Sequence, residues 1–221
     1  MKNSLSLYLV MGSQDCPHQN PVEILEEAIA GGITCFQFRE KLSGKTGIEI
    51  IRLGRQLRQI CADHQIPFIA NDRVDLGLIL EADGIHIGQD DLPAYEVRKL
   101  IGPRRLLGVS AKTPAEAHKA LQDGANYIGV GPMFTTSSKL DASAPIGPKA
   151  IEHIRQELPD IPIVGIGGIT TERAGQVISA GADGVAVISA ITKSSSPYEV
   201  TKNFCRQIAI TKKEKNKMIM D

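Results

Sequence analysis

The chain has no tryptophan, and aromatic residues make up only 4% of its 221 positions. Proteins that bind single-stranded nucleic acid stack bases on aromatic rings, so this shortage argues against that class. An excess of positive charge is also missing, because 25 lysines and arginines balance 25 aspartates and glutamates. The formal net charge of +0 argues against nucleic acid or a membrane surface as a partner, but leaves room for a local cationic pocket.

A thiolate metal motif and a long apolar run are also missing from the sequence. Four widely spaced cysteines form no C-x-x-C pair, which favours neutral thiols in a reducing compartment: Cys16, Cys35, Cys61 and Cys205. No apolar stretch approaches the roughly 20 residues of a membrane helix. Polar residues 13–15 interrupt the apolar run at 5–11, which is too short for a signal peptide. We therefore expect a cytoplasmic protein; its oligomeric state is not fixed, and a homo-oligomer remains open.

Apolar runs of strand type alternate with helical periodicity along the chain. The predicted strands cover residues 6–11, 35–39, 67–71, 84–87, 106–110, 127–131, 162–166 and 184–188. Capping patterns such as Thr113-Pro114-Ala115-Glu116 precede the helices, and glycines end them. Eight such units in about 220 residues predict an α/β fold, a (β/α)8 TIM barrel, with a doubly wound open sheet as the alternative.

The predicted barrel is one domain over residues 1–211, and the lysine-rich end at 212–221 is expected to be a frayed polar tail. Branched side chains on the strands are expected to fill the barrel interior. These residues are Ile69, Ile85, Ile87, Ile128, Val130, Ile163, Val164, Val185 and Val187.

The second predicted strand ends with an amide and two cations. Gln37, Arg39 and Lys41 alternate with Phe36 and Phe38 just before a break in the pattern. Arginine offers a planar fork and lysine a point charge, which together suit an oxygen-rich anion. The alternative is a solvated strand edge on which Lys41 only deters aggregation.

A phosphate cradle is predicted after the seventh strand. Gly167 and Gly168 would let the backbone approach a phosphate closely, next to the start of a helix. Ile188 and Ser189, after the eighth strand, would add backbone N–H groups, and loops 7 and 8 are the usual phosphate site of this fold.

Two aspartates on neighbouring strands form a candidate metal site. Asp72 follows the third strand and Asp91 the fourth, so both carboxylates can reach one cation. Hard oxygen ligands favour Mg²⁺, which usually adds substrate phosphates to one or two carboxylates. The alternative is that they cap helices starting near Val74 and Pro93. His86 is expected to be structural or to line the pocket.

The combination of motifs resembles the thiamine phosphate synthase family from the first predicted strand to the eighth. The motifs are Gln37-Phe38-Arg39-Glu40-Lys41, Asn71-Asp72, His86-Ile87-Gly88-Gln89-x-Asp91, Gly108-Val109-Ser110, Gly131-Pro132-x-Phe134 with Lys139, and Val164-Gly165-Ile166-Gly167-Gly168-Ile169. The family joins an aminopyrimidine diphosphate to a thiazole phosphate and releases diphosphate, so the resemblance implies a transferase of thiamine biosynthesis that needs Mg²⁺.

The resemblance also implies a role for each matching residue. The pyrimidine diphosphate would be held by Gln37, Phe38, Arg39, Glu40, Lys41, Asn71, Ser110 and Lys139, of which Arg39, Ser110 and Lys139 would be catalytic. The thiazole phosphate would be held by Thr136, Ser137, Ser138, Gly168, Ile188 and Ser189, and Mg²⁺ by Asp72 and Asp91. Glu40 is out of line with its cationic neighbours and is expected to orient them.

Two positions depart from the family pattern. Ser138 stands where threonine is usual and keeps the hydroxyl, whereas Lys112 replaces a common histidine and could add charge near the diphosphate. A thiazole tautomerase on the same barrel is the nearest alternative, but it should lack the metal and diphosphate residues. A phosphosugar isomerase would leave the aspartate pair unexplained, and a non-catalytic binding barrel is a further alternative.

Overall fold

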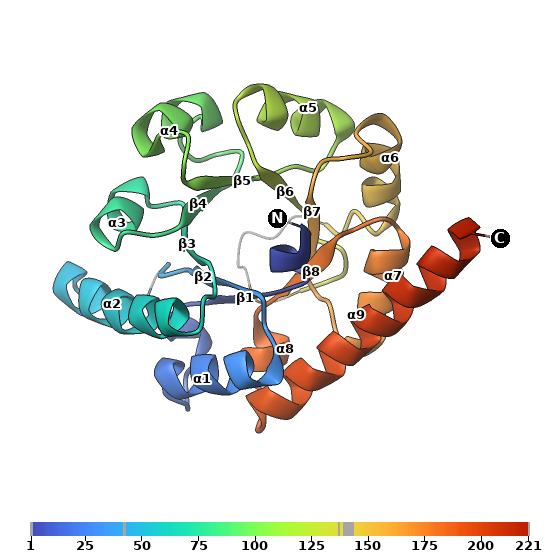
Figure 1. The fold of residues 1–221 in the computed structure, drawn as a ribbon. Helices are drawn as coiled ribbons and strands as arrows, with labels where there is room; N and C mark the ends of the chain where they lie inside the picture. The colour runs from blue at the N-terminus through green and yellow to red at the C-terminus, as the bar shows by residue number, and fades with distance from the viewer. Residues whose placement is uncertain (1, 42, 137, 139–143, 221) are drawn as a thin grey trace.

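The structure of the chain is a computed structural model that describes residues 2–220, apart from residues 42, 137 and 139–143. Its centre is a closed barrel of parallel strands in which β1 pairs with both β2 and β8 (Figure 1). The strands are β1 (Leu7–Met11), β2 (Cys35–Phe38), β3 (Phe68–Asn71), β4 (Gly84–Ile87), β5 (Leu106–Ser110), β6 (Tyr127–Val130), β7 (Ile163–Ile166) and β8 (Gly184–Val187). The predicted TIM barrel is therefore confirmed, and the open sheet is wrong.

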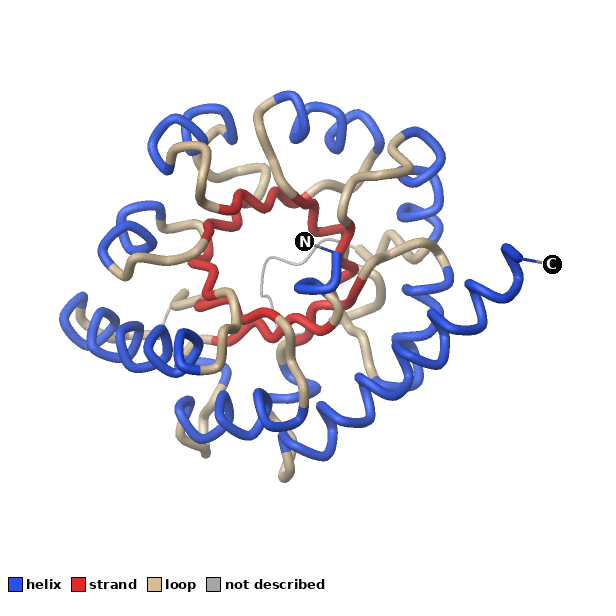
Figure 2. Tube along the Cα trace, viewed as in Figure 1, coloured by secondary structure: helices blue, strands red, loops and turns tan. Residues whose placement is uncertain are grey.

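Helices surround the ring of strands, as Figure 2 shows in blue around red. They are α1 (Pro21–Gly31), α2 (Gly47–Asp63), α3 (Val74–Ile79), α4 (Ala94–Ile101), α5 (Pro114–Gln122), α6 (Lys149–Glu157), α7 (Thr171–Ser179), α8 (Ser189–Thr192) and α9 (Pro197–Met220), with the 3₁₀ helices η1 (Lys2–Leu5) and η2 (Ser13–Asp15). The Thr113 hydroxyl accepts from the Glu116 backbone N–H at 3.2 Å, as the capping pattern predicts.

Two apolar layers line the two faces of the strands. The inner layer contains Leu5, Tyr8, Val10, Cys35, Ile69, Tyr127, Val164, Ala186 and Ile188. Of the branched residues expected inside, only Ile69 and Val164 belong to it, and the others pack in the outer layer with the helices. The expectation failed because strands of a parallel barrel are apolar on both faces, so the sequence does not mark which face points inward.

The 3₁₀ helix η1 lies over the amino-terminal end of the barrel, where Figure 1 places the start of the chain. Leu5 is 1% exposed and joins the inner layer. The contact with β8 is close, because a Cβ added at Gly184 would lie 1.7 Å from the Leu5 carbonyl oxygen. The opposite, carboxyl-terminal end is left to carry the polar residues that follow the strands.

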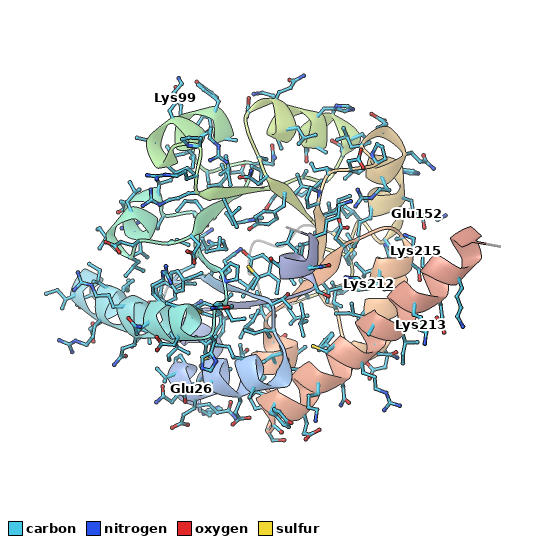
Figure 3. The ribbon with its side chains drawn as sticks, viewed as in Figure 1. Glu26, Lys99, Glu152, Lys212, Lys213 and Lys215 are labelled. Carbon is cyan, nitrogen blue, oxygen red and sulfur yellow. The ribbon has the colours of Figure 1, made fainter. Side chains whose placement is uncertain are left out.

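Helix α9 packs along α1 and α7 and continues to Met220. The segment from residue 212 is thus helical and not the expected frayed tail, because lysine and glutamate are good helix formers that extend an established helix without a new nucleation cost. The Lys212 ammonium donates to the Ser6 hydroxyl at 3.2 Å, and Figure 3 labels this lysine on α9. No helix among the described residues combines the length and apolarity needed to cross a bilayer.

Candidate active site

The predicted polar residues gather around the carboxyl-terminal mouth of the barrel. Arg39 and Lys41 follow β2, Asp72 follows β3, and Ser110 ends β5. Because parallel strands end on the same rim, these side chains reach one site from different strands.

An ammonium and two carboxylates form the centre of this site. The Lys41 ammonium nitrogen lies 2.9 Å from an Asp72 carboxylate oxygen. Asp91 accepts a hydrogen bond from the Gly88 backbone N–H at 2.7 Å, and its carboxyl interacts with that of Asp72. The Lys41 side chain is 44% exposed but turned to a partner across the rim, a contact that the solvated-edge alternative does not predict.

Neither aspartate caps a helix. Helix α3 begins after Arg73 and α4 after Pro93, and neither start has a side-chain cap. Asp72 also has a left-handed backbone, with φ of 59°, which is uncommon outside glycine and occurs most often with asparagine, aspartate and histidine. The helix-cap alternative fails for both residues because neither helix start is capped by a side chain.

The pKa values of the two carboxyl groups are shifted in opposite directions. Burial opposes the ionisation of Asp72, but the Lys41 hydrogen bond and the interaction with Asp91 outweigh burial and lower the Asp72 pKa. Burial raises the pKa of Asp91, and its bond from Gly88 only partly offsets burial and the neighbouring Asp72 charge. The Asp72 bond raises the pKa of Lys41. The site therefore holds a concentration of negative charge that the Lys41 ammonium balances only in part.

The donor set fits Mg²⁺. Two carboxylates converge on a position next to the Lys41 ammonium, and hard oxygen donors are the ligands that Mg²⁺ prefers. Within the described parts of the chain there is no group of three or more histidine, cysteine, aspartate or glutamate side chains that could hold a metal.

The residues of β2 and its loop divide between site and core. Arg39 is only 6% exposed, and the Asp15 carboxyl is among the groups that feel its charge. Phe38 faces away from the mouth, because its ring lies 5.9 Å from the Phe68 ring in the outer layer. Glu40 accepts from the Ser13 backbone N–H at 2.6 Å, so it binds the loop after β1 instead of a neighbouring cation.

Ser110 is held from two sides. Its hydroxyl lies 3.1 Å from His86 Nε2, and its carbonyl oxygen accepts from the Gln89 amide at 2.5 Å. Asn71 ends β3 in register with His86 on β4. His86 thus bonds to Ser110, a predicted diphosphate residue.

A cavity of about 600 Å³ opens on the other side of the mouth. It is lined by Ser110 together with the predicted thiazole phosphate residues Thr136, Ser138, Gly168, Ile188 and Ser189. The Ser138 hydroxyl donates to the Ser189 hydroxyl at 3.0 Å, which ties the loop after β6 to the start of α8. The predicted site residues Ser137 and Lys139 lie outside the described residues.

Comparison with known proteins shows the family of the chain. A family model described as thiamine monophosphate synthase matches residues 7–191. The chain is 52% identical over 215 residues to a thiamine-phosphate synthase of Anoxybacillus flavithermus, covering 97% of this chain and 98% of the relative. It is 49% identical over 210 residues to one of Bacillus thuringiensis, covering 95% of each.

The chain belongs to the thiamine monophosphate synthase family. A solved thiamine phosphate pyrophosphorylase from Pyrococcus furiosus has the same fold, with a TM-score of 0.84 at 31% identity, covering 95% of this chain and 98% of the other. The family predicted from the motifs is thus confirmed, and the chain is a transferase of thiamine biosynthesis that acts on small molecules.

Three cations in this thiamine monophosphate synthase barrel lie outside the residues that carry the family resemblance. Lys112, Arg173 and Lys193 all line the cavity, and Arg173 places its guanidinium 4.9 Å from the centre of the Phe134 ring. Only Lys112 was noted, as a departure from the family pattern. Arg173 lies on α7, and Lys193 follows the last residue of α8. The sequence around a single cation on a helix does not distinguish a residue that lines a pocket from one that faces solvent.

Asp91→Asn is expected to raise the free energy of unfolding at neutral pH. A carboxyl whose pKa is raised by folding holds its proton more tightly in the folded protein, so stability falls as the pH rises through the folded pKa. Asparagine removes that cost and can still accept from Gly88. Thermal unfolding in EDTA should show the gain at pH 7 and its disappearance at acidic pH. A matching gain in the exposed neighbour Asp90→Asn would contradict this explanation.

Proposed function

We propose that the chain joins 4-amino-5-hydroxymethyl-2-methylpyrimidine diphosphate to thiazole phosphate, giving thiamine phosphate and diphosphate. One observation carries this proposal: two differently built anion sites share a single mouth. One is the cationic and acidic cluster of Arg39, Lys41, Asp72 and Asp91, and the other is the glycine-lined cavity next to Ser138 and Ser189. A reaction between a diphosphate and a phosphate ester needs both.

In the proposed reaction the diphosphate leaves the pyrimidine methylene with the bonding electron pair. The Arg39 and Lys41 cations and the Ser110 hydroxyl bind its oxygens, and Lys139 is proposed to join them. Asp72 and Asp91 would hold Mg²⁺, which when bound supplies positive charge against the leaving diphosphate. Preorganised charge of this kind acts most strongly where charge develops in the transition state.

The second substrate is proposed to bind through its phosphate. Gly168 and the hydroxyls of Ser138 and Ser189 would hold the thiazole phosphate, so that the thiazole nitrogen faces the methylene carbon. Its lone pair then forms the new carbon–nitrogen bond, and the ring becomes a thiazolium. Because both steps are electrostatic, the chain needs no covalent nucleophile.

The main alternative is a thiazole tautomerase on the same barrel. An isomerase of that kind has no use for a paired carboxylate site with a resident ammonium. The Lys41–Asp72 contact of 2.9 Å beside Asp91 therefore favours the synthase. The cytoplasmic location and the oligomeric state remain predictions.

The proposal is tested by incubating the protein with both substrates and Mg²⁺ and measuring thiamine phosphate and diphosphate. We expect the two products in equal amounts, no product when either substrate is omitted, and loss of turnover in EDTA that Mg²⁺ restores. Isomerised thiazole phosphate without diphosphate release would show that the tautomerase alternative is right. Mg²⁺ should also raise the melting temperature of the wild type in the absence of substrates.

A further inference from the structure

A line of hydrogen-bonded polar groups crosses the apolar interior of the barrel. The Gln37 amide nitrogen on β2 donates to the Tyr8 hydroxyl on β1 at 3.0 Å. The Tyr8 and Tyr127 hydroxyls lie 2.9 Å apart, although β1 and β6 are not neighbours in the barrel. Both tyrosines are at most 1% exposed.

The line continues from Tyr127 to the mouth. Its hydroxyl lies 3.1 Å from His86 Nδ1, and His86 Nε2 lies 3.1 Å from the Ser110 hydroxyl. The interior network therefore ends on the serine that is predicted to contact the diphosphate. We call the four bonds from Gln37 to Ser110 the interior chain.

Glycines on the strands leave room for the interior chain. Gly108 on β5 lies in register between His86 on β4 and Tyr127 on β6. A Cβ at position 108 would lie 2.4 Å from both His86 Nδ1 and the Tyr127 hydroxyl oxygen. A Cβ at Gly129 would lie 3.0 Å from the His86 ring. The histidine and tyrosine can meet only because these two positions carry no side chain.

The hydrogen bonds of the interior chain can run in one direction, from donor to acceptor, that leaves the Ser110 proton available to an anion. An amide nitrogen only donates, so the Tyr8 oxygen accepts from Gln37, and its own proton can go to Tyr127, with the Cys35 thiol as the other neighbour within reach. Tyr127 can then donate to His86 Nδ1, which places the ring proton on Nε2. Nε2 donates to Ser110, and the serine proton is left to point into the mouth. In the reversed direction Ser110 would present a lone pair to the anion.

We propose that the interior chain holds His86 as the Nε2–H tautomer and so aims the Ser110 hydroxyl proton at the diphosphate. Tyr8, Tyr127 and His86 are then positioning residues, and Ser110 is the member of the interior chain that binds the diphosphate oxygens. The role in turnover rests on the proposed function, but the direction of the interior chain is a property of the protein without ligands. Burial raises the pKa of both tyrosines, which keeps their protons available to the chain.

The direction is tested by ¹⁵N NMR of the imidazole nitrogens in the wild-type protein. His86→Gln identifies the His86 signals among the five histidines. We expect a protonated Nε2 and an unprotonated Nδ1. A proton on Nδ1, or on both nitrogens, would overturn the proposal whether or not the protein makes thiamine phosphate.

Variants test the consequence for anion binding. Tyr127→Phe removes the donor to His86, and we expect inorganic diphosphate, measured with Mg²⁺, to bind about tenfold more weakly, the value of one ordinary hydrogen bond. The KM for thiazole phosphate should stay unchanged. Tyr8→Phe, one bond further away, should have a smaller effect. Tyr198→Phe, which removes an exposed hydroxyl bonded to Lys202 on α9, is the control and should have none.

Substitution of His86 separates positioning from packing. His86→Leu fills similar space without a donor and should weaken diphosphate binding, whereas His86→Gln keeps a donor near Ser110 and should restore part of it. Equal diphosphate binding by His86→Leu and His86→Gln would mean that the interior chain contributes only to stability. The same conclusion would follow if Tyr127→Phe changed neither the His86 tautomer nor diphosphate binding.

Discussion

Asp72→Asn is expected to lower turnover by about 10²–10³-fold while leaving the protein folded. The substitution removes a carboxylate charge at the centre of the proposed Mg²⁺ site and releases its partner, the Lys41 ammonium. Asparagine is chosen because it tolerates the left-handed backbone of position 72, where φ is 59°. Alanine would add backbone strain and confuse a loss of function with a loss of stability.

The matched control is Asp75→Asn, three residues further along the chain. Asp75 has a 58% exposed side chain and pairs with Arg73 on the surface, so its loss should leave turnover unchanged. Steady-state rates and thermal unfolding of both variants with and without Mg²⁺ give the comparison. Asp72→Asn should lose the Mg²⁺-dependent rise in melting temperature. Wild-type turnover in this variant would remove Asp72 from the mechanism.

Gly168→Ala is expected to raise the KM for thiazole phosphate by about 10²-fold, because misplacement of a binding group by about 1 Å can cost that factor. A Cβ at this position would lie 2.4 Å from the Thr135 carbonyl oxygen and 2.8 Å from that of Phe134. Both are backbone atoms, so the loop after β6 has to move away from the cradle. The KM for the pyrimidine diphosphate should change little.

Gly102→Ala separates this effect from backbone strain. Gly102 has φ of 71°, close to the 64° of Gly168, but no atom lies within 4 Å of an added Cβ. Both variants place an alanine at a positive φ, which costs about 1–3 kcal/mol, and only Gly168→Ala displaces the loop. Equal KM values in the two variants would mean that the cradle does not bind the phosphate.

The sequence predicted the barrel and its rim because both depend on local signals. Strand-type runs, helix caps and terminal glycines can each be recognised from a few neighbouring residues. Once the fold class is known, the carboxyl ends of all strands are known to lie on the same rim. These signals were enough to predict that Arg39, Lys41, Asp72 and Asp91 lie at the rim. The alternation of Phe36 and Phe38 with Gln37 and Arg39 indicated a strand, but Phe38, which the resemblance assigned to the pyrimidine diphosphate, packs in the outer layer.

Contacts that depend on closure of the barrel could not be predicted. Tyr8 and Tyr127 are 119 positions apart, and neither carries a local pattern that separates a hydrogen-bonded tyrosine from a core one. Glu40 binds Ser13 because η2 folds back over the end of β2, which no spacing in the sequence indicates. The inward face of each strand was likewise unmarked, since both faces are apolar.

The pairing of β1 with β8 has a consequence for how the protein is made. These strands come from opposite ends of the chain, so the edge of β1 that pairs with β8 stays unpaired until nearly all residues have been synthesised. Contacts between distant parts of a chain form slowly, and exposed strand edges favour aggregation in the meantime. Helix α9 then packs on both α1 and α7, across the seam that β1 and β8 close. Shortening the chain at its carboxyl end should therefore reduce the yield of folded protein more than it reduces the activity of the molecules that fold.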